Sequence, residues 1–157
     1  MHVVCGKIAS GKSTLAQDIA RDEGGFLLSE DFLLAALYPK EIFTLEDYRR
    51  CTGRLREAIG PLVISLLDRG HSIVLDFQAN TTSSREWIRH LFEAGDADHK
   101  LHYLEASDAV CRARLSARNA GGRYQYQVSE AEFDLFTSYF VPPTLAEGVN
   151  VIVHKQA

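Results

Sequence analysis

Residues 6–13 read Gly6-Lys7-Ile8-Ala9-Ser10-Gly11-Lys12-Ser13, and this stretch decides the fold class of the 157-residue chain. It has the form Gly-x-x-x-x-Gly-Lys-Ser, in which the glycines let backbone N–H groups converge on phosphate oxygens. Lys12 adds a positive charge for the β- and γ-phosphates, and the Ser13 hydroxyl can ligate Mg²⁺. The pattern therefore predicts a loop that binds nucleotide phosphates.

The residues on either side of this loop fit a strand that leads into a helix. Residues 3–5 form a short apolar run, and a helical pattern from Lys12 to about Asp22 places Leu15 and Ile19 on one face. This context separates a phosphate loop from a chance match, and a helix N-terminus favours a bound anion. The expected nucleotide contacts are Gly6, Ala9, Ser10, Gly11, Lys12, Ser13 and Thr14.

The rest of the chain alternates short β-rich runs with helical patterns, which is typical of an α/β fold with a largely parallel sheet. We expect one domain over residues 1–157, built as a three-layer sandwich of five mostly parallel strands with helices on both faces. The strands are expected near residues 3–5, 26–28, 72–76, 101–104 and 149–153. Gly60-Pro61 predicts a kink or break in a long helix that runs to Arg69.

The composition narrows the possible partners. A net charge of −4 disfavours a dedicated nucleic-acid binder without excluding one. The three cysteines are scattered and the six histidines lack metal-binding spacing, so we expect reduced thiols and no histidine metal site. With no signal-like N-terminus and no apolar run long enough for a bilayer, the sequence predicts a cytoplasmic protein without a membrane partner.

Carboxylates follow two of the expected strands, at the edge where ligands of such folds gather. Asp31 is the preferred catalytic base, which would take a proton from an acceptor hydroxyl, and Glu30 stays open as the alternative. The plainer role for this pair is to cap a helix. Asp76 is expected to hold Mg²⁺ together with Ser13, or to orient the acceptor, and Asn80 is a weaker substrate contact.

An arginine-rich segment follows the fourth expected strand. Arg114 and Arg118 are four residues apart and share a helix face, ahead of a glycine pair that could act as a hinge. We expect residues 114–128 to form a lid over the triphosphate, with Arg118 stabilising developing charge. Arg114 would contact the nucleotide and Arg123 the substrate. A solvated basic helix face is the alternative.

A second basic cluster, Arg49 to Arg56, lies on the long middle helix. It could cover the acceptor site. A solvated face paired with Glu46, Asp47 and Glu57 is at least as good an interpretation, and the sequence leaves both open.

In this order the features resemble the small P-loop kinases of the polynucleotide kinase, zeta toxin and chloramphenicol phosphotransferase type. Ser29-Glu30-Asp31 matches their Ser-x-Asp, and Asp76 is followed by Asn80 and Arg85 as in that group. Arg114 and Arg118 match the lid pair. The resemblance implies a nucleoside-monophosphate-kinase-like fold with an arginine lid, Asp31 as the base, Arg118 as the lid arginine and Mg²⁺-ATP as the donor.

The resemblance covers nearly the whole chain, and residues 128–154 also resemble uncharacterised bacterial AAA-type ATP-binding proteins. One departure concerns the acceptor. Polynucleotide kinases usually carry an arginine three residues after the base, where this chain has Leu34. An apolar residue there is more compatible with a small, partly apolar hydroxyl compound than with a nucleic-acid end.

The sequence thus predicts an ATP-dependent phosphotransferase that acts on a hydroxyl of a small molecule. A polynucleotide or nucleotide-sugar kinase is the second interpretation, and an ATP-binding switch that acts through a protein partner is a third. Phe77 follows Asp76, so the acidic pair that usually aims water in ATPases is absent, which favours transfer over hydrolysis. The acceptor, the choice between ATP and GTP, and the oligomeric state stay open.

Overall fold

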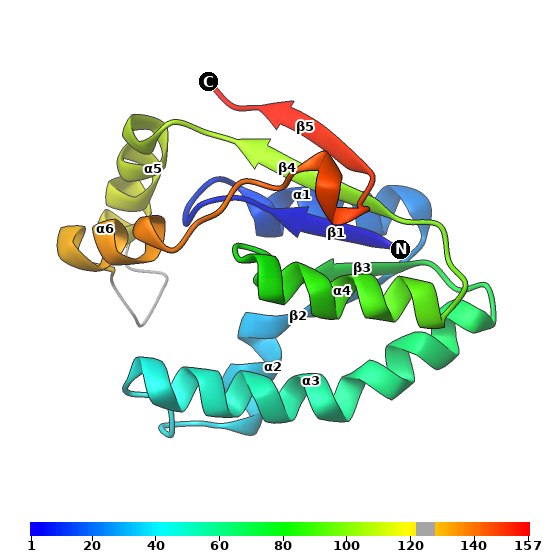
Figure 1. The fold of residues 1–157 in the computed structure, drawn as a ribbon. Helices are drawn as coiled ribbons and strands as arrows, with labels where there is room; N and C mark the ends of the chain where they lie inside the picture. The colour runs from blue at the N-terminus through cyan, green and yellow to red at the C-terminus, as the bar shows by residue number, and fades with distance from the viewer. Residues whose placement is uncertain (122–127) are drawn as a thin grey trace.

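A computed structural model describes residues 1–121 and 128–157. Its five strands form one sheet in the order β2-β3-β1-β4-β5, and every neighbouring pair runs parallel (Figure 1). The strands are β1 (His2–Cys5), β2 (Phe26–Ser29), β3 (Ile73–Asp76), β4 (Lys100–Glu105) and β5 (Val151–Lys155). This confirms the predicted α/β fold, with a sheet that is parallel throughout the described residues.

Helices cover both faces of this sheet. They are α1 (Lys12–Glu23), α2 (Glu30–Leu37), α3 (Leu45–Asp68), α4 (Thr82–Ala94), α5 (Asp108–Ala120) and α6 (Glu130–Ser138), with a 3₁₀ turn η1 (Leu145–Glu147) before β5. Alternate strand residues face opposite layers. Val4 and Val74 pack with Ala16 of α1, whereas Val3 and Leu75 join a larger core with residues of α3 and α4. The three-layer sandwich follows from this alternation.

Local capping signals set most helix starts. Ser29 caps α2 by accepting from the Phe32 amide at 3.4 Å, and Thr44 and Asp47 form a reciprocal capping box at the start of α3. The predicted break at Gly60-Pro61 is wrong, because α3 continues through both residues. Gly60 is buried where a Cβ would lie 3.7 Å from a Leu91 methyl group of α4, so packing between α3 and α4 keeps this stretch helical.

A second, smaller core lies under α5 and α6, which lie together on the side of the sheet to which the strand arrows point (Figure 1). Cys111 and Leu115 of α5 pack against Phe133 of α6, and Ile8 of the phosphate loop packs onto them. Arg112 joins the two helices through ion pairs with carboxylates of α6, and its guanidinium lies over the Phe133 ring at 4.4 Å. Arg112 is therefore a structural arginine that fixes α5 beside the phosphate loop.

Within residues 1–121 and 128–157, no helix is both long enough and apolar enough to cross a membrane.

Candidate active site

The loop between β1 and α1 has the backbone geometry that phosphate binding requires. Gly6 and Gly11 have φ angles of 156° and 101°, and a Cβ on Gly6 would lie 2.7 Å from the Ser10 hydroxyl oxygen. Gly11 is the N-cap of α1, and no side chain caps this helix. The first N–H groups of α1 are thus left without a side-chain acceptor, at the end of the helix that attracts anions.

Lys12 folds back over this loop. Its Nζ donates to the carbonyl oxygens of Gly6 and Lys7, both at 2.8 Å. Burial lowers the pKa of Lys12, and the negative charges of Asp76 and Asp31 act in the opposite direction. The ammonium group therefore lies within electrostatic reach of both strand-end carboxylates that the sequence singles out.

Ser13 and Asp76 meet across the sheet edge. Ser13 lies at the start of α1 and Asp76 at the end of β3, close enough for the Ser13 hydroxyl to stabilise the charged Asp76 carboxylate. Burial raises the pKa of Asp76, while the Ser13 hydroxyl and the charge of Lys12 oppose the increase. A hydroxyl and a carboxylate side by side are oxygen donors suited to Mg²⁺.

Glu30 and Asp31 have different surroundings although they are adjacent in sequence. Glu30 is only 3% exposed, and its carboxylate accepts hydrogen bonds from the Tyr48 hydroxyl at 3.0 Å and the backbone N–H of Gln78 at 3.2 Å. Arg56 of α3 lies 3.5 Å from the same carboxylate. Burial raises the pKa of Glu30, whereas the charge of Arg56 and these hydrogen bonds oppose that effect. Glu30 thus joins α2, α3 and the segment after β3.

Asp31 is instead exposed in the first turn of α2. The register of the sheet pairs Ser29 with Asp76, so α2 begins directly beside the end of β3. This arrangement brings the Asp31 charge within reach of Lys12 and Asp76. Of the two candidate bases, Asp31 has the carboxylate that is open to an incoming group.

The basic cluster of α3 divides between two environments. Arg56 turns inward, where its guanidinium lies 5.0 Å from the centre of the Trp87 ring and close to Glu30. Arg49, Arg50 and Arg54 are exposed, and Arg50 pairs with Asp47 at 2.8 Å. The solvated interpretation therefore holds for three of these arginines, and only Arg56 faces the candidate site.

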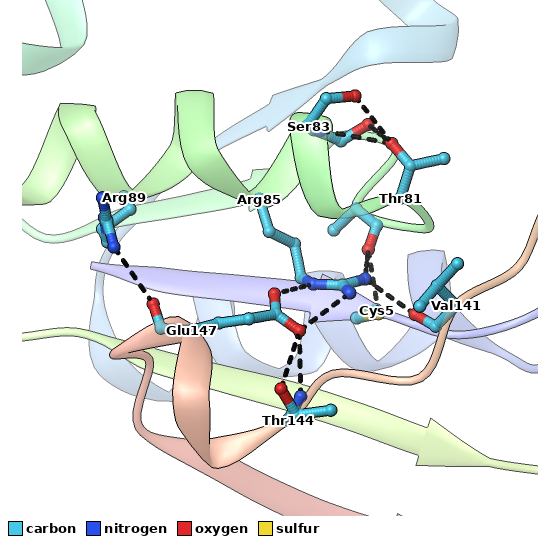
Figure 2. Close-up of polar contacts among 10 residues, drawn as sticks. Cys5, Thr81, Ser83, Arg85, Arg89, Val141, Thr144 and Glu147 are labelled. Carbon is cyan, nitrogen blue, oxygen red and sulfur yellow. Dashed lines mark hydrogen bonds and ion pairs between the residues drawn. The ribbon is translucent and has the colours of Figure 1, made fainter.

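Arg85, the residue that matches the arginine of the small P-loop kinases, is buried and occupied by contacts within the protein. Its side chain is 1% exposed and forms an ion pair with Glu147, with Nη2 donating at 3.0 Å. Nη1 donates to the carbonyl oxygens of Ala79 at 2.8 Å and Val141 at 2.9 Å, and Figure 2 shows the Arg85 side chain between Val141 and Glu147. Arg85 therefore joins α4, the segment after β3 and the chain before β5. The sequence carries no local signal for Glu147, its partner 62 residues away.

Replacing Glu147 by alanine is expected to lower the free energy of unfolding by about 3–5 kcal/mol, because the buried Arg85 charge would lose its partner. Urea denaturation followed by circular dichroism measures this loss. The matched control is Glu93→Ala, which removes the exposed Arg89–Glu93 pair and should cost less than about 1 kcal/mol. Equal losses in the two variants would contradict the structural role of the Arg85–Glu147 pair.

The two described arginines of the predicted lid lie on successive turns of α5. Arg114 reaches back to the phosphate loop, where Nη1 donates to the Ser10 carbonyl at 2.8 Å and to the Gln156 side chain at 3.3 Å. Arg118 is half-buried in the last turn of α5. Arg123 and most of the segment beyond Gly121 lie outside the described residues.

A hollow of about 370 Å³ lies beside the start of α1, on the β4–β5 side of the phosphate loop. Thr14, Arg114, His154 and Gln156 are among the residues that line it. The residues that the sequence predicts to contact the acceptor follow β2 and β3 instead, and the strand order β2-β3-β1-β4-β5 puts the phosphate loop between the two regions. In parallel α/β sheets, ligands bind at such a point, outside the carboxyl ends of the strands.

Residues 1–143 match the AAA domain family. A comparison with curated proteins finds no match. Among solved structures, a candidate kinase from Chloroflexus aurantiacus j-10-fl has a TM-score of 0.73 and 21% identity, covering 98% of this chain and 84% of its own. A gluconokinase from Sinorhizobium meliloti 1021 has a TM-score of 0.66 and 21% identity, covering 98% of this chain and 81% of its own. Mycobacterium tuberculosis APS kinase, in complex with AMPPNP and APS, has a TM-score of 0.56 and 21% identity, covering 80% of this chain and 76% of its own. At these identities the likeness is one of fold.

Proposed function

Because this chain belongs to the AAA domain family, we propose that it is a kinase that transfers the γ-phosphoryl group of ATP to a hydroxyl group of a small molecule. One observation carries the proposal. Lys12, Ser13 and Asp76 converge where the phosphate loop meets the end of β3, with the Asp31 charge close to them. Phosphoryl transfer depends on positioning and on charge stabilisation, and these are the groups it uses.

The donor nucleotide fits along the phosphate loop and toward β5. The uncapped N–H groups of α1 can accept phosphate oxygens, and Lys12 can exchange its two loop carbonyls for the β- and γ-phosphates. Thr14 is close to the start of the same helix, and Arg114 and Gln156 border the adjoining hollow. The base of the nucleotide would occupy that hollow.

Mg²⁺, when bound, would neutralise charge on the β- and γ-phosphates. Ser13 and Asp76 would hold it, since their oxygen atoms already lie side by side at the sheet edge. The positive charge of Lys12 would keep the Asp76 carboxylate ionised and so available to bind the metal ion.

The acceptor fits on the β2–β3 side of the loop. Asp31 would take the proton of the attacking hydroxyl as a general base, because Glu30 is already committed to Tyr48 and Gln78. The Asn80 side-chain oxygen is buried without a hydrogen-bond partner among residues 1–121 and 128–157, which supports its role as a substrate contact. Arg123, beyond the described residues, stays a predicted contact.

Two residues favour a small acceptor and transfer rather than hydrolysis. Leu34, at the position where polynucleotide kinases usually carry a phosphate-gripping arginine, is 5% exposed and packs into the core. Phe77, directly after Asp76, is 1% exposed, so no second carboxylate follows the strand-end aspartate to aim a water molecule.

A transfer screen with γ-labelled ATP tests the proposal. The acceptors are sugars, sugar acids, nucleotide sugars, hydroxyl-bearing antibiotics and 5′-hydroxyl oligonucleotides, each with Mg²⁺. We expect label to appear on a small-molecule hydroxyl compound and not on the oligonucleotide. Release of labelled phosphate at one unchanged rate in every mixture, with no labelled product, would instead indicate an ATPase module.

Arg118→Ala is expected to lower kcat by roughly 10²-fold with a smaller change in nucleotide affinity, because a lid arginine contacts charge that develops in the transition state. Steady-state kinetics with the acceptor from the screen measures kcat and KM separately. The control is Arg69→Ala, which removes an exposed arginine at the end of α3 and should leave both constants unchanged. Wild-type turnover in Arg118→Ala would reduce this residue to a part of the helix surface.

A further inference from the structure

Three histidines on neighbouring strands form a continuous row of hydrogen bonds. His2 of β1 meets His102 of β4 through Nδ1 and Nε2 at 3.0 Å, and Nδ1 of His102 meets Nε2 of His154 of β5 at 2.9 Å. The centroids of successive rings lie 5.3 and 5.2 Å apart. At the other end, Nε2 of His2 lies 2.7 Å from a carboxylate oxygen of Glu23, the last residue of α1. We call Glu23, His2, His102 and His154 the histidine row.

The carboxylate fixes the direction of every hydrogen bond in this row. An ionised carboxylate only accepts, so Nε2 of His2 must donate to Glu23, and in a neutral ring this leaves Nδ1 of His2 as an acceptor. His102 then donates from Nε2 and accepts at Nδ1, and His154 donates from Nε2 in turn. The same rule leaves Nδ1 of His154 as an acceptor.

The surroundings of His2 and His102 favour the neutral form of both rings, as this assignment requires. Burial lowers the pKa of His2, although Glu23 acts in the opposite direction. Burial, followed by the neighbouring charges of His2 and His154, lowers the pKa of His102 to about 4. Near neutral pH His2 and His102 therefore each carry one proton, and the hydrogen bonds that run from them to His154 have a single consistent direction.

The row ends at the hollow beside the phosphate loop. His154 lines this space together with Arg114 and Gln156. Among residues 1–121 and 128–157, no hydrogen bond is formed at Nδ1 of His154. Because Nε2 donates to His102, Nδ1 is the acceptor atom of His154, a residue that borders the space assigned above to the base of the nucleotide.

We propose that His154 selects adenine over guanine, with Nδ1 accepting a hydrogen bond from the exocyclic amino group of adenine. This inference rests on the proposed function, which puts the base in this hollow. At the same position guanine presents a carbonyl oxygen, which is also an acceptor, so the two groups would meet without a proton between them. Leaving a buried acceptor unpaired disfavours binding, and we expect ATP to bind about tenfold or more tightly than GTP.

The proposal makes Glu23 a positioning residue, although it sits at the far end of α1 from the phosphate loop. In Glu23→Gln the amide can donate as well as accept, so the direction of the row is no longer fixed and Nδ1 of His154 can carry a proton. We expect the preference for ATP over GTP to fall toward parity. The Glu23 side chain is 47% exposed, so this variant should fold.

Calorimetric titration of the full chain with Mg²⁺-ATP and with Mg²⁺-GTP tests the proposal on wild type, Glu23→Gln, His154→Leu and the control Asp22→Asn. Asp22→Asn makes the same charge change one residue away, outside the row, and should keep the wild-type ratio of affinities. Nitrogen-15 NMR of the imidazoles reports the tautomer directly. We expect an unprotonated Nδ1 at His154 in the wild type and a protonated fraction in Glu23→Gln.

Equal affinity of the wild type for ATP and GTP would overturn the proposal, as would an unchanged preference in both Glu23→Gln and His154→Leu. A wild-type His154 protonated at Nδ1 would also overturn it, whatever the affinities. If the wild type binds neither nucleotide, the proposed function fails and the selectivity argument fails with it. Binding of ATP without selectivity defeats only the role of the histidine row.

Discussion

Replacing Lys12 by alanine is expected to weaken ATP binding by roughly 10²-fold or more. The ammonium group is held inside the phosphate loop, and removing one partner of a buried charged contact costs about 2–5 kcal/mol of binding free energy. Isothermal titration calorimetry with Mg²⁺-ATP measures the loss. Without the ligand, the Lys12 side chain contacts two loop carbonyls. Solvent can reach these carbonyls once the lysine side chain is removed, so we expect the variant to remain folded.

Lys7→Ala is the matched control for this experiment. Lys7 lies in the same loop, but its side chain pairs with Asp108 at the start of α5 rather than turning back over the loop. Its removal should leave ATP affinity within a few-fold of the wild type. Unchanged affinity in Lys12→Ala, with the fold intact by circular dichroism, would defeat the assignment of residues 6–13 as the nucleotide site.

The parts of the site that the sequence predicts are those encoded over short distances. The phosphate loop requires a strand before it and a helix after it, and Ser29 and Thr44 mark helix starts by their own hydrogen bonds. Asp31 and Asp76 each stand out in the sequence because they follow an expected strand, and parallel pairing brings the ends of these two strands, β2 and β3, together.

The parts that the sequence does not predict depend on contacts between distant residues. Arg85 and Glu147 are 62 positions apart, and His2 and His102 are 100 apart. A single sequence shows each of these residues without its partner, so an arginine buried by an ion pair cannot be told from an arginine in solvent. The histidine row likewise has no spacing signature, because it runs across strands and not along the chain.

Glu30 and Asp31 show that the sequence does not tell which of two adjacent carboxylates is buried. Both start the same helix, where successive residues point about 100° apart, so the two side chains face different surroundings. The structure resolves this through Tyr48 and Arg56, because α3 supplies the partners that make Glu30 the buried member.

Asp31→Asn should therefore leave ATP affinity within a few-fold of the wild type but lower kcat by roughly 10²- to 10⁴-fold, the range expected for loss of a general base. Glu30→Gln is the matched variant one residue away. It should lower thermal stability, because the amide cannot reproduce the ion pair with Arg56, and its kcat should fall much less. Single-turnover transfer from labelled ATP, with calorimetry on the same samples, separates chemistry from binding. If Asp31→Asn transfers at the wild-type rate while Glu30→Gln is folded and inactive, the base is Glu30, and the buried cluster with Tyr48 and Arg56 becomes the catalytic machinery.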